Sequence, residues 1–123
     1  MNATYKIEPE QRIIFSIWSG IVTYDEAIAA TNALLLDRQF NPHYNRIYDV
    51  REVTEVRLTK ASLMELAQID PIYPSERRAV VATNPSVFGV GRMYGLLTGK
   101  EEKGSFRVVS DIQQALDWFK EPR

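Results

Sequence analysis

The side chains that most often act as general bases or nucleophiles are scarce in this sequence, which has one histidine, His43, and no cysteine. An α/β serine hydrolase holds its nucleophile in a G-x-S-x-G turn, and no such segment is present. Pro42 and Tyr44 flank His43, a context typical of a surface turn. We therefore predict no catalytic residues and no enzymatic activity. An enzyme whose carboxylates meet only in the folded chain is a weaker alternative.

Metal and cofactor sites are not predicted either. With no cysteine and one histidine, only an oxygen-rich metal site remains, and Glu52 and Glu55 are too sparse for a calcium loop. Residues 89–95 hold three glycines in a spacing loosely similar to a phosphate-binding loop. Such glycines must lie in the turn before a helix, whereas Asn84-Pro85 already begins one, as a capping residue followed by proline. We therefore expect no metal and no cofactor.

Gly91 and Gly95 lie inside this predicted helix, although glycine there costs about 1 kcal/mol relative to alanine. At about 100° per residue, they lie away from an apolar stripe that is expected to face the core. The stripe consists of Val87, Val90, Met93, Tyr94 and Leu97. Small residues one turn apart let another backbone approach closely. That backbone belongs either to a neighbouring helix of the same domain or to a second copy of the chain. The homodimer contact would then include Phe88, Gly91, Arg92, Gly95 and Leu96.

Turn and capping residues predict the elements that must position these side chains. Apolar, β-branched runs predict strands at residues 4–8, 12–18, 46–50, 78–83 and 105–109, with Gly20 ending the second. Helices are predicted at 23–37, at 59–69, from 84 and from 110. Each begins at a side chain that accepts hydrogen bonds from free backbone amides, namely Thr23, Thr59, Asn84 and Ser110.

The resulting order, β-β-α-β-α-β-α-β-α, predicts an α/β fold. Alternation of strands and helices favours a mostly parallel five-stranded sheet with right-handed crossovers, an antiparallel first strand and about four helices. The length of 123 residues fits one domain, residues 1–123.

Composition excludes several kinds of partner. Fifteen basic and sixteen acidic residues give a net charge of −1, so no basic surface for nucleic acid is predicted. The apolar runs are much shorter than the roughly 18 residues of a membrane span, and no secretory signal is visible. We expect a cytoplasmic protein that binds neither nucleic acid nor metal and does not span a membrane.

Residues 40–54, 91–94 and 106–119, with this order of elements, resemble the STAS-like group typified by sporulation anti-anti-sigma factors, the SpoIIAA-like proteins. More narrowly, they resemble an uncharacterised bacterial branch of that group. The resemblance implies a SpoIIAA/STAS-like fold and regulation through protein contacts. The lipid-carrying domains of the Sec14 type share the same winding, which implies a different class of function.

In the well-studied members of that group, a partner kinase phosphorylates the serine of a D-S-x-G-like motif at the start of a helix. Residues 53–62 correspond to this motif and contain neither an Asp-Ser pair nor a glycine. Thr59 is the hydroxyl nearest to the expected place and is therefore the candidate phosphorylation site. Its role as a helix N-cap also explains it.

A binding site is predicted at the carboxyl edge of the sheet, where open α/β folds bind ligands. Asp49 lies at the end of one predicted strand, with Arg51 and Thr54 after it, and Asn84 and Ser86 follow the next strand. The helix that begins at Asn84 exposes free amides that attract an anion. The alternative is that Asn84 only caps this helix and that Asp49 and Arg51 form a surface ion pair worth under about 1 kcal/mol.

We therefore expect a non-enzymatic binding or regulatory module that acts through contacts with an unidentified protein partner, and a homodimer is a further expectation. The alternative is a carrier or sensor of a small apolar or lipid-like ligand, by analogy of fold. A deep cavity lined by side chains such as Phe15, Tyr48 and Tyr94 would favour the carrier. A filled core would favour the partner-binding module.

Overall fold

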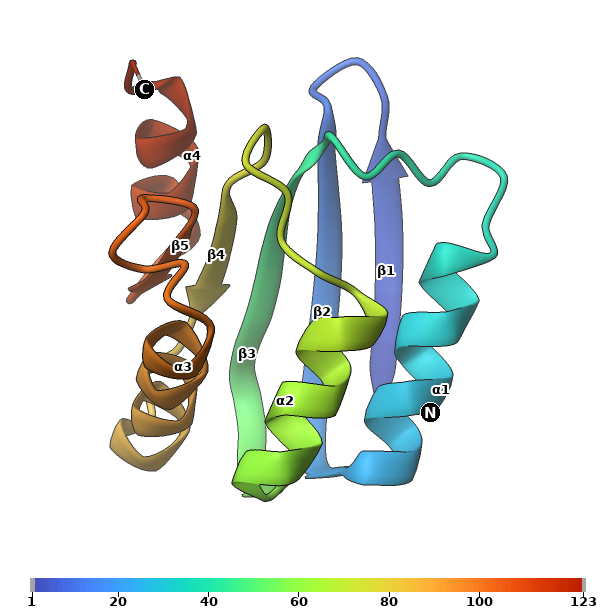
Figure 1. Cartoon of the computed structure of the whole chain (residues 1–123), viewed down its shortest axis with the longest axis vertical. Coiled ribbons are helices and arrows are strands. Elements are labelled where there is room, and N and C mark those ends of the chain that lie inside the picture. The colour runs from blue at the N-terminus through green and yellow to red at the C-terminus, as the bar shows by residue number, and fades with distance from the viewer. Residues whose placement is uncertain (1, 123) are drawn as a thin grey trace.

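One mixed five-stranded sheet forms the centre of the fold in the computed structural model, which describes residues 2–122 (Figure 1). Its strands are β1 (Ala3–Glu8), β2 (Ile13–Thr23), β3 (Asn45–Arg57), β4 (Arg78–Val81) and β5 (Phe106–Val109). They lie side by side in chain order, with β1 antiparallel to β2 and every other neighbouring pair parallel. The predicted fold class is confirmed, including its antiparallel first strand.

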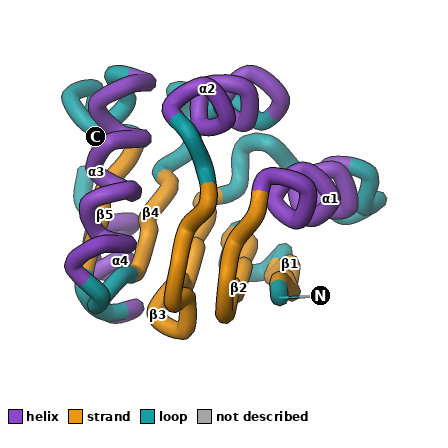
Figure 2. Tube along the Cα trace, turned by 90° about the horizontal axis from the view of Figure 1, so that it is seen from below, coloured by secondary structure: helices purple, strands orange, loops and turns teal. Residues whose placement is uncertain are grey.

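Four helices complete the fold and cover both faces of the sheet. They are α1 (Tyr24–Leu35), α2 (Lys60–Ile69), α3 (Pro85–Thr98) and α4 (Ile112–Lys120). Figure 2 shows α1 and α2 on the same side of strands β1 to β3. Helix α3 packs on that side as well, whereas α4 packs on the opposite face.

Alternation of side chains along the strands divides the core into two layers. The layer under α4 contains Ile13, Ile47, Ala79, Val81, Val109, Ala115 and Trp118. The layer under α1, α2 and α3 contains Val22, Ala27, Val53, Ala82 and Val87. Met93, predicted to face the core, is instead 40% exposed. The candidate site lies in the second layer.

Three of the four predicted helix caps are confirmed. Thr23, Thr59 and Asn84 each accept a hydrogen bond from a backbone amide in the first turn of the helix that follows. The prediction for α4 is wrong by one residue, because the Asp111 carboxylate caps this helix and accepts from the Gln114 amide at 2.8 Å. A negative charge there also interacts favourably with the helix dipole.

Replacing Thr59 with alanine is expected to lower the free energy of unfolding by about 1 kcal/mol, the usual loss for an N-cap. The threonine hydroxyl accepts from the Ser62 amide at 3.1 Å, and alanine leaves that amide without its partner. Thr59→Ser and Thr59→Asp keep an acceptor and are expected to remain close to wild type. Urea denaturation measures all three variants. A loss in Thr59→Ser as large as in Thr59→Ala would contradict the capping role.

Two strands are longer than predicted. Gly20 does not end β2, which continues to Thr23, and β3 continues beyond Val50 to Arg57. The backbone of Gly20 has a φ of +67°, and the pairing of β2 with β3 changes register beside it. Glycine adopts positive φ without a steric penalty, so it permits a β-bulge at a position where the sequence suggests a stop.

Gly91 and Gly95 face strand β5 rather than a second helix. A Cβ atom on Gly91 would lie 3.1 Å from Val108 Cγ2, and one on Gly95 would lie 2.9 Å from Phe106 Cδ1. The prediction that these glycines lie away from the core is therefore wrong. Side chains of the sheet beneath α3, Val108 and Phe106, approach these glycines, and the apolar stripe of the helix did not indicate this contact.

The other three residues predicted at a homodimer contact have different surroundings on α3. Phe88 packs partly against the core layer beneath the helix. Arg92 forms an ion pair with Glu101 at 3.0 Å. Leu96 is 66% exposed. The homodimer stays a prediction, and its accessible contacts are Arg92 and Leu96.

Candidate functional site

A cavity of about 190 Å³ lies between the sheet and helices α1, α2 and α3. Its walls are mostly apolar side chains of these helices and of strands β2 to β5, among them Val22, Val53, Leu63, Val80, Val87 and Val90. For comparison, an engineered apolar cavity of about 150 Å³ holds a benzene molecule. This cavity therefore has room for a small organic molecule built on about one ring.

Four polar side chains of the lining, Tyr48, Asp70, Arg78 and Tyr94, gather in one cluster. The parallel pairing of β3 with β4 sets Arg46 directly beside Arg78. Tyr48 follows Arg46 by two residues and so points to the same face of the sheet. The register of two strands thus brings two guanidinium groups and a phenol to the edge of the cavity.

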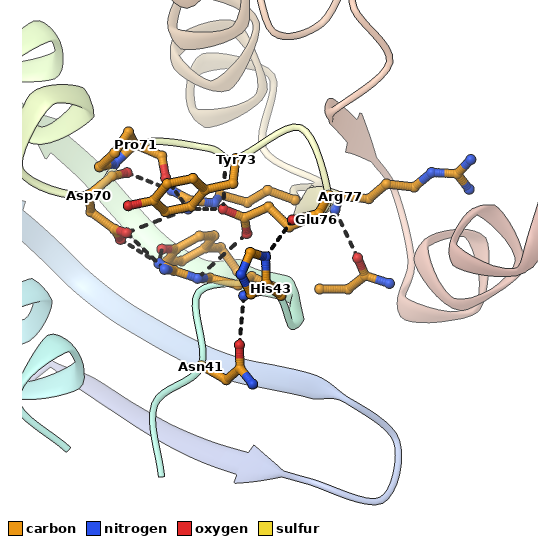
Figure 3. Close-up of polar contacts among 12 residues, drawn as sticks. Asn41, His43, Asp70, Pro71, Tyr73, Glu76 and Arg77 are labelled. Atoms are coloured by element: carbon orange, nitrogen blue, oxygen red, sulfur yellow. Dashed lines mark hydrogen bonds and ion pairs between the residues drawn. The ribbon is translucent and has the colours of Figure 1, made fainter. Parts of the chain in front are cut away.

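Two adjacent arginines need counter-charges, and the loop between α2 and β4 supplies them (Figure 3). Arg46 Nη2 donates to Asp70 Oδ1 at 2.8 Å, and Arg46 Nη1 donates to the other Asp70 oxygen and, at 3.1 Å, to the Tyr48 hydroxyl. Arg78 Nη2 donates to Glu76 Oε1 at 3.0 Å. The result is an interlinked group of two positive and two negative side chains.

All four charged side chains of this group are buried, with exposures of 0% for Arg46 and Glu76, 3% for Arg78 and 6% for Asp70. Burial opposes the positive charge of Arg46. Interactions with the neighbouring Tyr48, with the hydrogen-bonded Asp70 and with Glu76 together outweigh this effect of burial. The pKa of Arg46 is therefore raised above its ordinary value. The arginines therefore stay charged, and the charges of the group cancel.

Tyr94 of α3 is the fourth residue of this polar cluster. Burial disfavours the phenolate and raises the pKa of the Tyr94 hydroxyl to about 12. The ring lies 5.3 Å from the ring of Phe106, which holds it against β5. At neutral pH the Tyr94 hydroxyl is therefore protonated and able to donate a hydrogen bond.

A second cavity, of about 150 Å³, lies between β1, β2 and α1. It shares four lining residues with the first cavity, namely Trp18, Thr31, Tyr48 and Asp70. Tyr48 and Asp70 are thus placed where the two spaces meet, and a molecule in either one would lie beside them.

Comparison with known proteins finds similarity in structure but not in sequence. No family model matches the chain, and no curated protein matches it. An uncharacterized protein of the DUF3478 family from Shewanella loihica PV-4, described as having a SpoIIAA-like fold, superposes with a TM-score of 0.66 at 20% identity, covering 95% of this chain and 93% of that one. An anti-sigma factor antagonist from Mycobacterium paratuberculosis superposes with a TM-score of 0.64 at 20% identity, covering 97% and 95%. The chain has a SpoIIAA-like fold. The fold implied by the resemblance of residues 40–54, 91–94 and 106–119 is therefore confirmed.

Two of the three aromatic residues whose presence in a cavity would favour a carrier line the cavity of this SpoIIAA-like fold. They are Tyr48 and Tyr94. Phe15 does not, because alternation along β2 turns its side chain to the other face, against the core layer under α4. Trp18 of the same strand lines the cavity instead.

The predicted site at the carboxyl edge of the SpoIIAA-like sheet divides into two separate pairs. Arg51 donates to Asp49 at 2.9 and 2.8 Å, and these hydrogen bonds hold the pKa of Asp49 below its usual value. Asn84 accepts from the Ser86 amide at 2.9 Å. Within residues 2–122, no hydrogen bond or ion pair joins this cap or Thr54 to the Asp49–Arg51 pair. The alternative roles, a surface ion pair and a helix cap, are both observed, and binding at this edge stays a prediction.

Part of this prediction depended on where β3 ends. Because β3 continues to Arg57, the residues Asp49, Arg51 and Thr54 lie within the strand rather than after it. Asp49 pairs in register with Val81, the last residue of β4. Asp49 therefore lies level with the carboxyl end of β4, the shorter strand, although β3 itself continues further.

His43 lies in the segment before β3, and its Nδ1 atom is 2.6 Å from Ser75 Oγ. Both side chains are exposed, and no carboxylate contacts His43 within residues 2–122. A histidine that activates a serine is normally oriented by a third group. The pair therefore lacks the geometry of a triad, and the absence of catalysis stays a prediction.

Within residues 2–122, no three metal-ligating side chains come together. No helix in that part of the chain is long and apolar enough to cross a bilayer.

The interpretation of the sequence misses the group of buried charges, Arg46, Asp70, Glu76 and Arg78. One signal for it is present: two predicted strands of mainly apolar residues each begin with arginine, Arg46 and Arg78. Arginine at the start of two neighbouring buried strands indicates that carboxylates must lie nearby.

Proposed function

We propose that this protein is a non-enzymatic binding module that holds a small, mostly apolar molecule between its sheet and helices α1, α2 and α3. The cavity of about 190 Å³ is the observation that carries this proposal. Protein interiors are normally close-packed. A pocket of this size leaves its apolar lining without the contacts of a packed interior. A bound molecule recovers the lost contacts.

Between the two functions expected from the sequence, the cavity supports the carrier or sensor rather than a module with a filled core. The lining is apolar over most of its area and meets a compact polar group at Tyr48, Asp70, Arg78 and Tyr94. Small-molecule sites commonly combine apolar walls with a few placed polar groups that fix orientation.

Filling the cavity is expected to remove the bound molecule. Val90 lies on α3 and lines the cavity, so Val90→Phe places a ring in the space that the molecule would occupy. Native mass spectrometry of protein purified from its own host is expected to show a small-molecule adduct on the wild type and none on Val90→Phe. Ile17→Phe is the matched control, because Ile17 is 50% exposed and does not line the cavity. A wild type without adduct, or a Val90→Phe protein that keeps it, would contradict the proposal.

A second candidate function is regulation through contact with a protein partner. The similarity in fold to the anti-sigma factor antagonist supports it. Thr59, which is exposed at the start of α2, would then be the residue to carry a phosphate. Phosphate on Thr59 in protein isolated from its native cells would favour this second function. An unmodified Thr59 together with a bound small molecule would favour the first.

A further inference from the structure

The polar part of the cavity lining holds a hydrogen-bond donor that has no acceptor. The Tyr94 hydroxyl is protonated and makes no hydrogen bond within residues 2–122. The Nε–H group of Arg78 also has no hydrogen-bond partner among those residues, but the surrounding atoms enclose it, so it does not face the cavity. A donor that lies against apolar walls without an acceptor is unfavourable. An acceptor atom on a bound molecule would satisfy the Tyr94 hydroxyl.

The charge of the cluster decides what kind of acceptor fits. Arg46 and Arg78 are already balanced by Asp70 and Glu76, with N–O distances of 3.0 Å for Arg78–Glu76 and 3.5 Å for Arg78–Asp70. A carboxylate or phosphate added to this group would be a buried charge without a counter-charge, which is strongly unfavourable. A neutral oxygen takes the same hydrogen bonds without that penalty.

We infer that the cavity selects molecules in which one neutral carbonyl oxygen, as in a ketone, aldehyde or ester, is joined to an apolar body of about one ring. The oxygen lies at the Tyr94 hydroxyl, and the apolar body lies among the valine and leucine side chains of the walls. This inference rests on the proposed function and adds the chemical class of the ligand.

Three probes of equal heavy-atom number test the inference: cumene, acetophenone and benzoate. They place an apolar group, a neutral carbonyl and a carboxylate on the same ring. Titration of ligand-free protein by calorimetry or NMR is expected to show acetophenone binding about tenfold more tightly than cumene, the factor that a hydrogen bond of ordinary strength provides. Benzoate is expected to bind at least about tenfold more weakly than acetophenone, because its charge is buried.

Tyr94→Phe separates the hydroxyl from the ring. This variant is expected to bind acetophenone at least about tenfold more weakly than the wild type does, because the carbonyl oxygen loses its donor, with the affinity for cumene unchanged. Tyr73→Phe is the matched control, since Tyr73 is 42% exposed and does not line the cavity. It is expected to leave all three affinities unchanged.

The alternative outcomes are distinct. Equal binding of acetophenone and cumene, or tightest binding of benzoate, would overturn the inference and leave the proposed function standing. Equal losses for both neutral probes in Tyr94→Phe would show that Tyr94 acts by packing alone, which overturns the role of its hydroxyl. Failure of all three probes to bind would overturn the inference and count against the proposed function as well.

Discussion

Replacing Arg46 with leucine is expected to lower the free energy of unfolding by about 3–5 kcal/mol, the range typical of removing one partner from a buried ion pair. Arg46 is 0% exposed. Without its guanidinium, Asp70 and Glu76 stay buried with only Arg78 to balance them. Leucine still occupies much of the space, so most of the loss arises from charge rather than from a cavity.

Arg51→Leu is the matched control for this prediction, because it removes an arginine–aspartate pair of the same kind from an exposed strand. The Arg51 side chain is 39% exposed, and its removal is expected to cost under about 1 kcal/mol. Urea denaturation followed by circular dichroism measures both variants. Adding Asp70→Asn to Arg46→Leu is expected to recover part of the loss, since it removes an unbalanced carboxylate. Equal losses for Arg46→Leu and Arg51→Leu would contradict a special role for the buried cluster.

Local chemistry explains why the order of elements and most helix starts could be predicted. A capping side chain accepts hydrogen bonds from amides two or three residues away. The helix starts at Thr59 and Asn84 can therefore be predicted from the sequence of a single turn. The start of α4 marks the limit of such information. Ser110 and Asp111 both contact Gln114, and only the path of the chain into the helix decides that Asp111 is the cap.

Strand ends could not be predicted in the same way, because they depend on partners far along the chain. Gly20 is compatible with a turn and with a β-bulge. The bulge forms because β2 pairs with β3 and because β3 has extra residues at the register shifts. The same pairing carries β3 through residues 51–57, which are mostly polar and lack the apolar alternation of a predicted strand.

The candidate site was only partly predictable for a related reason. An apolar stripe indicates which side of a helix faces the sheet, and Val87, Val90 and Tyr94 do face it. It does not indicate whether side chains fill the space beneath. The buried charges depend on the register that sets Arg46 beside Arg78, a relation between two strands that no local pattern contains.

Replacing Gly95 with leucine is expected to lower the free energy of unfolding by roughly 3 kcal/mol, the upper part of the usual range for overpacking. A Cβ atom there would lie 2.7 Å from Glu101 Oε2 and 2.9 Å from Phe106 Cδ1. The Glu101 carboxylate is at the end of a flexible side chain and is able to shift. Phe106 is 2% exposed and packed, so the helix must move away from β5 instead.

Gly89→Leu on the same helix provides the comparison that isolates this effect, because a Cβ on Gly89 meets nothing within 4 Å. The better helix propensity of leucine is expected to stabilise that variant by about 0.5–1 kcal/mol. Thermal and urea unfolding measure stability, and sedimentation measures assembly at the same concentrations. One outcome would contradict packing within one chain: a dimeric wild type and a Gly95→Leu variant that is monomeric but equally stable. The glycines would then belong to a homodimer contact. Loss of stability in Gly95→Leu alone would show that α3 needs glycine to approach β5, and the predicted homodimer would then rest on exposed side chains such as Leu96.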